Sequence, residues 1–533
     1  MNHTNGPVPI RLDALNRWWL EHRVVVLAVF ALNLLAFGYL FFTYIYSNHL
    51  FPNALDLGFP SYRTRLEGRW GADIIYRLQG GRGIPLLDLM LAVPIQIANG
   101  LLFARLFAIR DPLRLFLAAA LISIHPYVSD YYAFAGDHLV LVLGDSFILL
   151  AFGLVQWRPR AWWAVAGAAF LFQAALSCYQ PKIGLISTLW VLLLLGRLAA
   201  WDGTAAAFGR DARELFRHAV AIVAGAALYM LLLKMVQWWM GDPTAVSAHA
   251  ATRLSTIGLS DLPHQLRWIR DVARQMLFES DFFGRGLAWL PGTLVLAFAA
   301  TVLLRIWVVA PRGLAAATTI VLLLAVALLP LALYAPFVIS REAYPAGRTL
   351  TPIVYLIAFA ATLLMTPGWL RILRWPALAV ALFLCYRYVL IDAETGHLAQ
   401  LRTTYEFHFV NRLAARVEQV AADAPAPVER YALVAIGLPP TPPIVTPSVR
   451  SMRNFSNLSH KAFTWYRSIE GLNFLLGKDL LKHPTQMQVQ RGLKNAEGRG
   501  VWPAEDSVSV LDDMILIVLE KPGDGVPVTM AAE

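Results

Sequence analysis

One polar segment of the chain carries an acid and several arginines between two long apolar runs. Asp56 lies with Arg65 and Arg69 in residues 47–83. A guanidinium group binds phosphate oxygens through two parallel hydrogen bonds, and a carboxylate can take the proton of a hydroxyl nucleophile. The apolar residues of this segment recur at helical spacing, which predicts an amphipathic helix lying in a membrane interface. The alternative is an interfacial helix with snorkelling arginines and a solvated acid.

A second polar connection precedes the apolar run 138–157. Tyr132 is followed there by Asp137 and His138, and Asp145 falls inside the run. A second acid near the first would let one act as base while the other orients the acceptor or stabilises charge. The simpler explanation of Asp137 is an acid at a helix N-terminus, where the helix dipole favours it. Asp145, as an acid within an apolar run, indicates a functional or packing site.

Two later connections add cations and aromatic residues. The stretch "LSCYQPKIG" places Tyr179, Gln180 and Lys182 between two apolar runs, and Arg341 and Arg348 precede a late run. Lys182 could reach a phosphate, or it could be a surface charge in a tight turn. Arg348 fits a phosphate contact and a lipid-headgroup anchor equally well.

The elements that must position these residues are predicted to be membrane spans. The chain has 533 residues, of which 58% are hydrophobic and 15% charged, and its mean hydropathy is +0.54. Such a composition is typical of a polytopic membrane protein. The first run lacks a cleavage site of the A-x-A kind, so we interpret it as a retained signal anchor. Eleven spans are predicted, at residues 24–46, 84–107, 113–128, 138–157, 161–177, 183–199, 218–240, 287–309, 314–335, 349–366 and 376–391.

The distribution of arginine predicts the orientation. The short, arginine-dense connections fall on the same side as residues 1–23, so we expect that side to be cytoplasmic. Residues 47–83 and 241–286 then form amphipathic outer loops. The net charge of +10 comes from arginines scattered among these connections, which argues against nucleic-acid binding and for membrane lipids and anionic lipid substrates. The two cysteines form no disulfide framework and no metal motif.

Residues 392–533 have a different composition and are predicted to form a small α/β domain on the outer face. The run "YALVAIGL" predicts a buried strand, and "SVSVLDDMILIVLE" predicts a hairpin that turns at Asp512 and Asp513. Helical patterns cover about 398–421 and 462–476.

Several short motifs, in order, give the chain a family resemblance. They are Asp56 followed by Gly68-Arg69-Trp70, then Pro126, Tyr132 and Asp137, then Tyr179-Gln180, then Arg348 and a small terminal domain that ends in a hairpin. The chain resembles the polytopic O-antigen glucosyltransferases, often called Gtr type II, within the GT-C class of membrane glycosyltransferases. Members often carry two adjacent acids in the first outer loop. Here Leu55 precedes Asp56, so that either Glu67 supplies the missing function or the acceptor differs.

The resemblance implies an all-α, GT-C-like membrane fold and a sugar transfer on the outer face of the bacterial inner membrane. The donor would be a polyprenyl-phosphate sugar, with glucose as the expected sugar, and the acceptor a lipid-linked glycan such as O-antigen. The protein would work with a donor synthase and a flippase, and it would need no metal and no cofactor. Asp56 would deprotonate the acceptor hydroxyl, and the anomeric configuration would invert.

The residues and the resemblance together assign three roles. The catalytic candidates are Asp56, Asp137 and Glu67. The candidates for binding the donor phosphate are Arg65, Arg69, Lys182, Arg341 and Arg348. The candidates for binding the substrate are Trp70, Tyr132, His138, Tyr179 and Gln180.

Two other functions are compatible with the sequence. A transporter or flippase of a lipid-linked sugar would require polar residues deep in several spans and broken helices. Apart from Asp145, Lys234 and a few other polar residues, the predicted spans are mostly apolar. A membrane scaffold whose outer domain binds a partner is the third reading.

Overall fold

The computed structural model describes most of the chain. The described residues are 12–42, 68–79, 85–132, 137–239, 260–279, 286–338, 346–366, 371–424, 428–439, 468–523, 525–526 and 528. Asp56, Arg65, Glu67 and Arg341 lie outside them.

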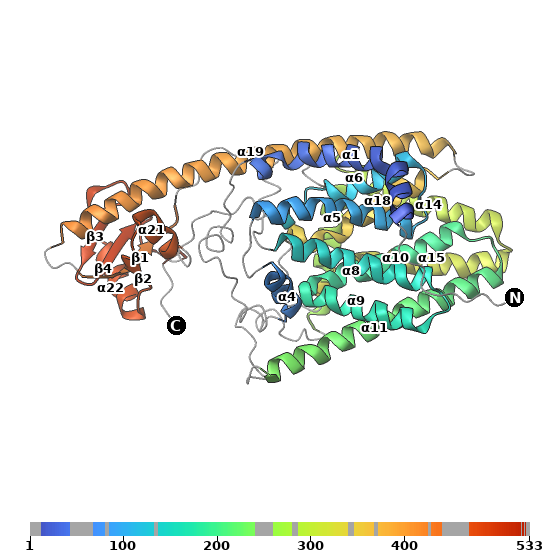
Figure 1. Cartoon of the computed structure of the whole chain (residues 1–533), viewed down its shortest axis with the longest axis horizontal. Coiled ribbons are helices and arrows are strands. Elements are labelled where there is room, and N and C mark those ends of the chain that lie inside the picture. The colour runs from blue at the N-terminus through green and yellow to red at the C-terminus, as the bar shows by residue number, and fades with distance from the viewer. Residues whose placement is uncertain are drawn as a thin grey trace.

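Most of the chain folds into a bundle of helices (Figure 1). Its first half contains α1 (Leu12–Phe42), α4 (Trp70–Leu78), α5 (Pro85–Leu106), α6 (Pro112–Ser123), α7 (Ser129–Tyr132), α8 (His138–Trp157), α9 (Trp162–Cys178), the short 3-10 helix η1 (Gln180–Lys182) and α10 (Ile183–Ala200). Its second half contains α11 (Ala205–Trp239), α13 (Leu262–Phe278), α14 (Leu290–Val309), α15 (Arg312–Leu333), α16 (Ala335–Val338), α17 (Gly347–Leu350), α18 (Pro352–Leu364) and α19 (Arg371–Ala422).

Within the described ranges, eight helices are long and apolar enough to cross a membrane, and three shorter apolar helices accompany them. The short ones are α6, α9 and α18, and α18 is apolar on all sides and almost entirely buried, as expected of a helix inside a bundle. Each of the eleven predicted runs coincides with one of these helices. The helical membrane fold is therefore confirmed, while the number of helices that cross the membrane stays a prediction.

The amphipathic helix expected in residues 241–286 is present as α13. Its buried face carries Ile269 and Met276, whereas Arg267, Arg270 and Arg274 are exposed. The helix expected in the first loop is described only as α4, which buries Ala72 and Tyr76 against the bundle.

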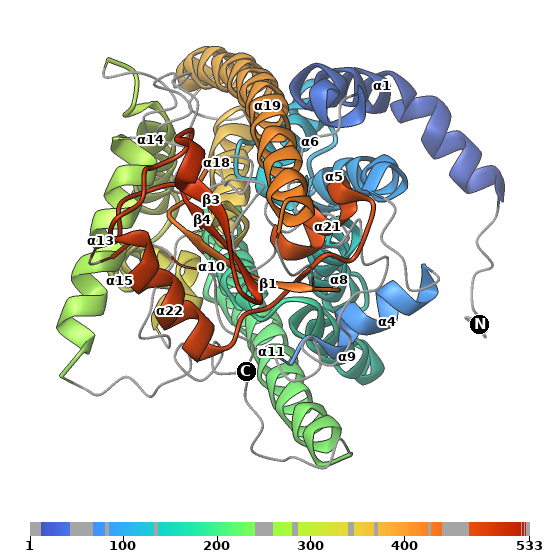
Figure 2. The ribbon, with the colours of Figure 1, turned by 90° about the vertical axis from the view of Figure 1, so that its left-hand side faces the viewer.

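The helix predicted at 398–421 is present, and it is the last part of α19, which runs without a break from Arg371 to Ala422. Gly396 lies inside α19 and packs closely against α1. A Cβ added at this glycine would lie 3.0 Å from Cβ of Tyr39. The boundary predicted at 391 therefore falls inside a continuous helix, and α1 and α19 lie side by side (Figure 2).

The C-terminal region contains a four-stranded sheet in the order β2-β1-β4-β3. The strands are β1 (Tyr431–Ile436), β2 (Leu481–Lys482), β3 (Val508–Leu511) and β4 (Met514–Val518). β1 is parallel to β2 and β4, whereas β3 and β4 form the predicted antiparallel hairpin. The end of α19 and α21 (Ser468–Leu476) cover one face, and α22 (Gln486–Ala496) covers the other. Burial on both faces explains why β1 and β4 are continuously apolar.

Candidate active site

The chain direction brings several connections together at one end of the bundle. α7 follows α6, η1 connects α9 to α10, and α17 precedes α18. These short elements therefore lie together at the end of the bundle where α8 begins. α4 packs against α8 and α9 at the same end (Figure 1). All described residues of the predicted site lie on or beside these elements.

Arg348 on α17 is held by two partners at this end. Its Nη1 forms an ion pair with Asp130 Oδ2 at 3.1 Å, and its Nε donates a hydrogen bond to the Tyr179 hydroxyl at 3.1 Å. Asp130 Oδ2 also accepts a hydrogen bond from the backbone N–H of Arg348 at 2.9 Å. Burial opposes the charge of Arg348, but Tyr179 and Asp130 outweigh it and raise the pKa of the guanidinium. Arg348 is therefore a fixed, permanently charged group, and its side chain keeps 19% exposure.

Arg69 reaches the same tyrosine from another part of the chain. Its guanidinium carbon lies 5.1 Å from the centre of the Tyr179 ring, within the range of a cation–π contact. Two guanidinium groups thus meet at one aromatic side chain.

The backbone around Arg69 is packed closely enough to require glycine. Gly68 has a φ of +78°, and a Cβ there would lie 2.6 Å from the Tyr229 hydroxyl and 2.9 Å from Gln180 Nε2. The Tyr229 hydroxyl donates a hydrogen bond to the Gly68 carbonyl at 3.1 Å. The Gly68-Arg69-Trp70 motif is therefore seated on the Tyr179-Gln180 motif, with α11 supplying Tyr229.

Asp137 is engaged by α4 and does not cap α8. It occupies the N-cap position of α8, but its side chain makes no cap hydrogen bond. Instead, Oδ1 accepts a hydrogen bond from the Tyr76 hydroxyl at 2.9 Å. Burial and then the Asp137 carboxylate raise the pKa of Tyr76 well above its ordinary value, so this phenol stays protonated and acts as a donor.

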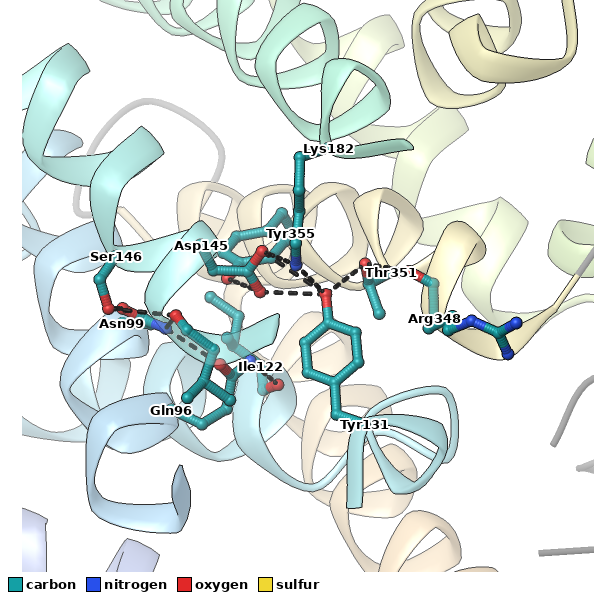
Figure 3. A network of polar contacts seen from close by, with 11 residues as sticks. Gln96, Asn99, Ile122, Tyr131, Asp145, Ser146, Lys182, Arg348, Thr351 and Tyr355 are labelled. Carbon is teal, nitrogen blue, oxygen red and sulfur yellow. Dashed lines mark hydrogen bonds and ion pairs between the residues drawn. The ribbon is translucent and has the colours of Figure 1, made fainter. Parts of the chain in front are cut away.

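Lys182 lies in a different, buried cluster with Tyr131, Asp145, Thr351 and Tyr355 (Figure 3). It forms an ion pair with Asp145, and the two side chains are 2% and 0% exposed. Lys182 Nζ also donates to the Tyr131 hydroxyl at 2.5 Å, and that hydroxyl lies 2.9 Å from Thr351 Oγ1. Tyr355 donates to Asp145 Oδ2 at 3.3 Å. Lys182 is therefore not the surface charge that its turn suggested, and its charge is already balanced by Asp145.

The two clusters are linked through short elements. Asp130 and Tyr131 are neighbours on α7, and Arg348 and Thr351 are one turn apart at the junction of α17 and α18. The Lys182–Asp145 cluster therefore fixes the same two elements that carry the Asp130–Arg348 pair.

Comparison with known proteins decides the family. The profile described as glucosyl transferase GtrII matches residues 58–365, which is more than half of the chain. The chain belongs to the glucosyl transferase GtrII family. The match contains the Gly68-Arg69-Trp70 and Tyr179-Gln180 motifs together with Asp137 and Arg348, and it begins two residues after Asp56. No curated protein and no solved structure gives a significant match.

Membership of the GtrII family confirms the resemblance drawn from the motifs and makes this membrane protein a glucosyltransferase by family. Of the predicted site residues, the structure brings together Arg69, Tyr179, Gln180 and Arg348, with Asp137 held by the neighbouring α4. Trp70 begins α4, directly after Arg69. Tyr132 and His138 are buried, and among the described residues neither forms a hydrogen bond or an ion pair with Arg348, Tyr179 or Asp130.

Sequence reasoning missed several residues of this GtrII glucosyltransferase. Asp130, the ion-pair partner of Arg348, stood in a connection already rich in acids and aromatic residues, so a signal existed. Tyr76 and Tyr229 gave no signal, because each lies on a helix whose partner is distant in the sequence. Within the part of the chain that the structure covers, no three His, Cys, Asp or Glu side chains are grouped as metal ligands would be.

Proposed function

We propose that this protein transfers glucose from a polyprenyl-phosphate donor to a hydroxyl group of a lipid-linked surface glycan such as O-antigen. The reaction takes place on the outer face of the bacterial inner membrane. Residues 24–391 form the catalytic membrane domain, residues 1–23 are cytoplasmic and residues 392–533 form a periplasmic domain. A synthase makes the donor on the cytoplasmic side, and a flippase delivers it.

The convergence of Arg69 and Arg348 on Tyr179 is the observation that carries this proposal. When the bond between glucose and phosphate breaks, negative charge grows on the polyprenyl phosphate. Guanidinium groups already held in place stabilise that charge without reorganising, which is often the largest contribution to catalysis. Asp130 forms an ion pair with Nη1 of Arg348, and Tyr179 accepts a hydrogen bond from Nε, so the guanidinium group is held in one orientation. Arg65 and Arg341 are proposed to add positive charge from neighbouring loops.

Asp56 is proposed as the general base. The acceptor hydroxyl gives its proton to Asp56, and its oxygen forms the new bond to the anomeric carbon. The bond from that carbon to the phosphate oxygen breaks, and the electron pair leaves with the polyprenyl phosphate. Asp137 or Glu67 then orients the acceptor or stabilises charge, and Trp70, Tyr132, His138 and Gln180 contact the sugars. No step of this reaction uses a metal or a cofactor.

A reconstituted assay tests the proposal. The purified full-length chain in proteoliposomes receives polyprenyl-phosphate glucose with a labelled sugar and a lipid-linked glycan acceptor. We expect labelled glycan from the wild type and none from Asp56→Asn. The matched control is Asp202→Asn, which removes an exposed carboxylate from the connection between α10 and α11, and this variant should retain transfer.

The same vesicles distinguish the competing function. Movement of the labelled lipid across the bilayer without any labelled glycan would show a flippase and reject the transferase. Membership of the GtrII family favours the transferase.

A further inference from the structure

α7 directs consecutive side chains to different partners. Asp130 pairs with Arg348, and Tyr131 contacts Lys182 and Asp145. Asp392 of α19 is near enough to Tyr132 and to Tyr388 to interact electrostatically with both phenols. This third location takes no part in the two clusters described above.

Asp392 is buried without a described partner. Its exposure is 2%, and neither carboxylate oxygen has a hydrogen bond to any residue in the described ranges. The hydroxyl groups of Tyr132 and Thr395 are equally buried and also lack a described partner. Four polar oxygens from three side chains therefore remain unsatisfied in one region. Burying a carboxylate in this way lowers the stability of the protein, so an acid kept there needs another reason.

The arrangement around Asp392 resembles an incomplete binding site. Tyr388, Asp392 and Thr395 follow one another at helical spacing, which places them on one face of α19. Phe37 of α1 packs edge-on against the Tyr132 ring, with centroids 4.9 Å apart. Acceptor oxygens, hydroxyl groups and aromatic rings from α1, α7 and α19 are thus gathered in one place.

The chemistry of these groups selects the ligand. An anion would find no cationic side chain among Asp392, Tyr132 and Thr395, and a lipid tail would leave their polar oxygens unsatisfied. A divalent cation would need more ligating side chains than the described residues group together. A neutral molecule with adjacent hydroxyl groups fits, because two hydroxyls can donate to the two oxygens of one carboxylate while a third bonds to a phenol or to threonine.

We propose that Asp392, Tyr132 and Thr395 form a sugar-binding subsite in which the Asp392 carboxylate accepts hydrogen bonds from adjacent hydroxyls of a hexose. The subsite deepens the proposed function and rests on it, since glucosyl transfer supplies both the donor glucose and the acceptor glycan as possible occupants. Asp392 is then a specificity-determining residue on the last helix of the bundle.

Stability and binding measurements on the full-length protein test this subsite. In detergent, Asp392→Asn removes the unsatisfied buried acid with almost no change in volume, so we expect its thermal midpoint to equal or exceed that of the wild type. Methyl glucoside, observed by saturation-transfer NMR, should bind the variant at least about tenfold more weakly, the loss expected for hydrogen bonds to a charged group. Glu394→Gln is the matched control, since it removes a half-buried acid from the same helix and should bind as the wild type does.

Steady-state transfer then identifies the occupant. A raised KM for the donor lipid in Asp392→Asn assigns the subsite to donor glucose, and a raised KM for the glycan assigns it to the acceptor. A lower thermal midpoint in Asp392→Asn would make the acid structural and overturn the proposal. Glucoside binding equal to that of the wild type would also overturn it, as would absent wild-type binding combined with an unchanged KM for both substrates.

The two proposals fail separately. Asp392-dependent glucoside binding without any transfer by the wild type would reject the proposed function alone. If the wild type transfers glucose but sugar binding does not depend on Asp392, the subsite alone is rejected.

Discussion

Nε of Arg348 donates a hydrogen bond to the hydroxyl of Tyr179 across 3.1 Å. The centre of the same ring lies 5.1 Å from the guanidinium carbon of Arg69. Tyr179 therefore offers its oxygen to one arginine and its π-electrons to another. The positive charges of Arg69 and Arg348 therefore meet at one side chain at the end of the bundle, and substitutions of Tyr179 can test each contact separately.

The first prediction concerns the geometry of Arg348. Arg348→Lys keeps the charge but cannot reach Asp130 and Tyr179 with a planar fork. We expect kcat/KM for glucosyl transfer to fall roughly 100-fold, the loss typical of removing one preorganised donor at a developing charge. Arg160→Lys changes an exposed arginine at the other end of the bundle and should have no effect. A fully active Arg348→Lys would show that the fork geometry is irrelevant to transfer.

The second prediction separates the two contacts of Tyr179. Tyr179→Phe removes the hydrogen bond to Arg348 and keeps a ring beneath Arg69, whereas Tyr179→Leu removes both contacts. A hydrogen bond to a charged group contributes about 1.5–3 kcal/mol, and a cation–π contact adds about 0.5–2 kcal/mol. Transfer kinetics should therefore rank wild type above Phe and Phe above Leu. Equal rates for Phe and Leu would remove the cation–π contact from the account.

The third prediction concerns the glycine before Arg69. In Gly68→Ala the new methyl group would meet the Tyr229 hydroxyl and the Gln180 amide, at a φ that alanine rarely adopts. Relief requires Arg69 to move from Tyr179, so transfer should drop while the protein still inserts. Gly209→Ala is the matched change at an exposed helical position with open space, and it should be neutral. The check is transfer activity at equal membrane expression, and similar activity of the two variants would contradict the close packing.

The fourth prediction addresses the buried Lys182–Asp145 pair. Removing either partner leaves an uncompensated buried charge, which costs roughly 3–5 kcal/mol. Asp145→Leu and Lys182→Met should each lower the thermal midpoint strongly in detergent, and the double variant should recover most of the loss. Additive losses would show that the two charges do not depend on each other.

The predictable parts of this protein are those with local signals. Long apolar runs located the helices of the bundle, and the alternation around Asp512 and Asp513 located the hairpin. The composition of the chain changes near residue 392, but local signals did not show that the last span and the helix at 398–421 are one helix, α19, which packs against Tyr39 of α1 at Gly396.

The residues of the candidate site also differ in whether they carry a local sequence signal. Arg69, Tyr179 and Arg348 could be named from motifs in polar connections. Lys182 could not be placed, because its partner Asp145 lies on a different helix and burial decides which charges meet. Asp392 gave no signal at all, since the polar oxygens around it come from separate segments of the chain.

Mass spectrometry of the lipid-linked surface glycan tests the central claim most directly. The comparison uses cells that differ only in whether this protein is present. The account predicts a glycan heavier by one hexose when the wild-type protein is present, with glucose released on hydrolysis, and no such increase with Arg348→Lys or Asp56→Asn at equal expression. A glycan of identical mass with and without the wild-type protein would contradict the account.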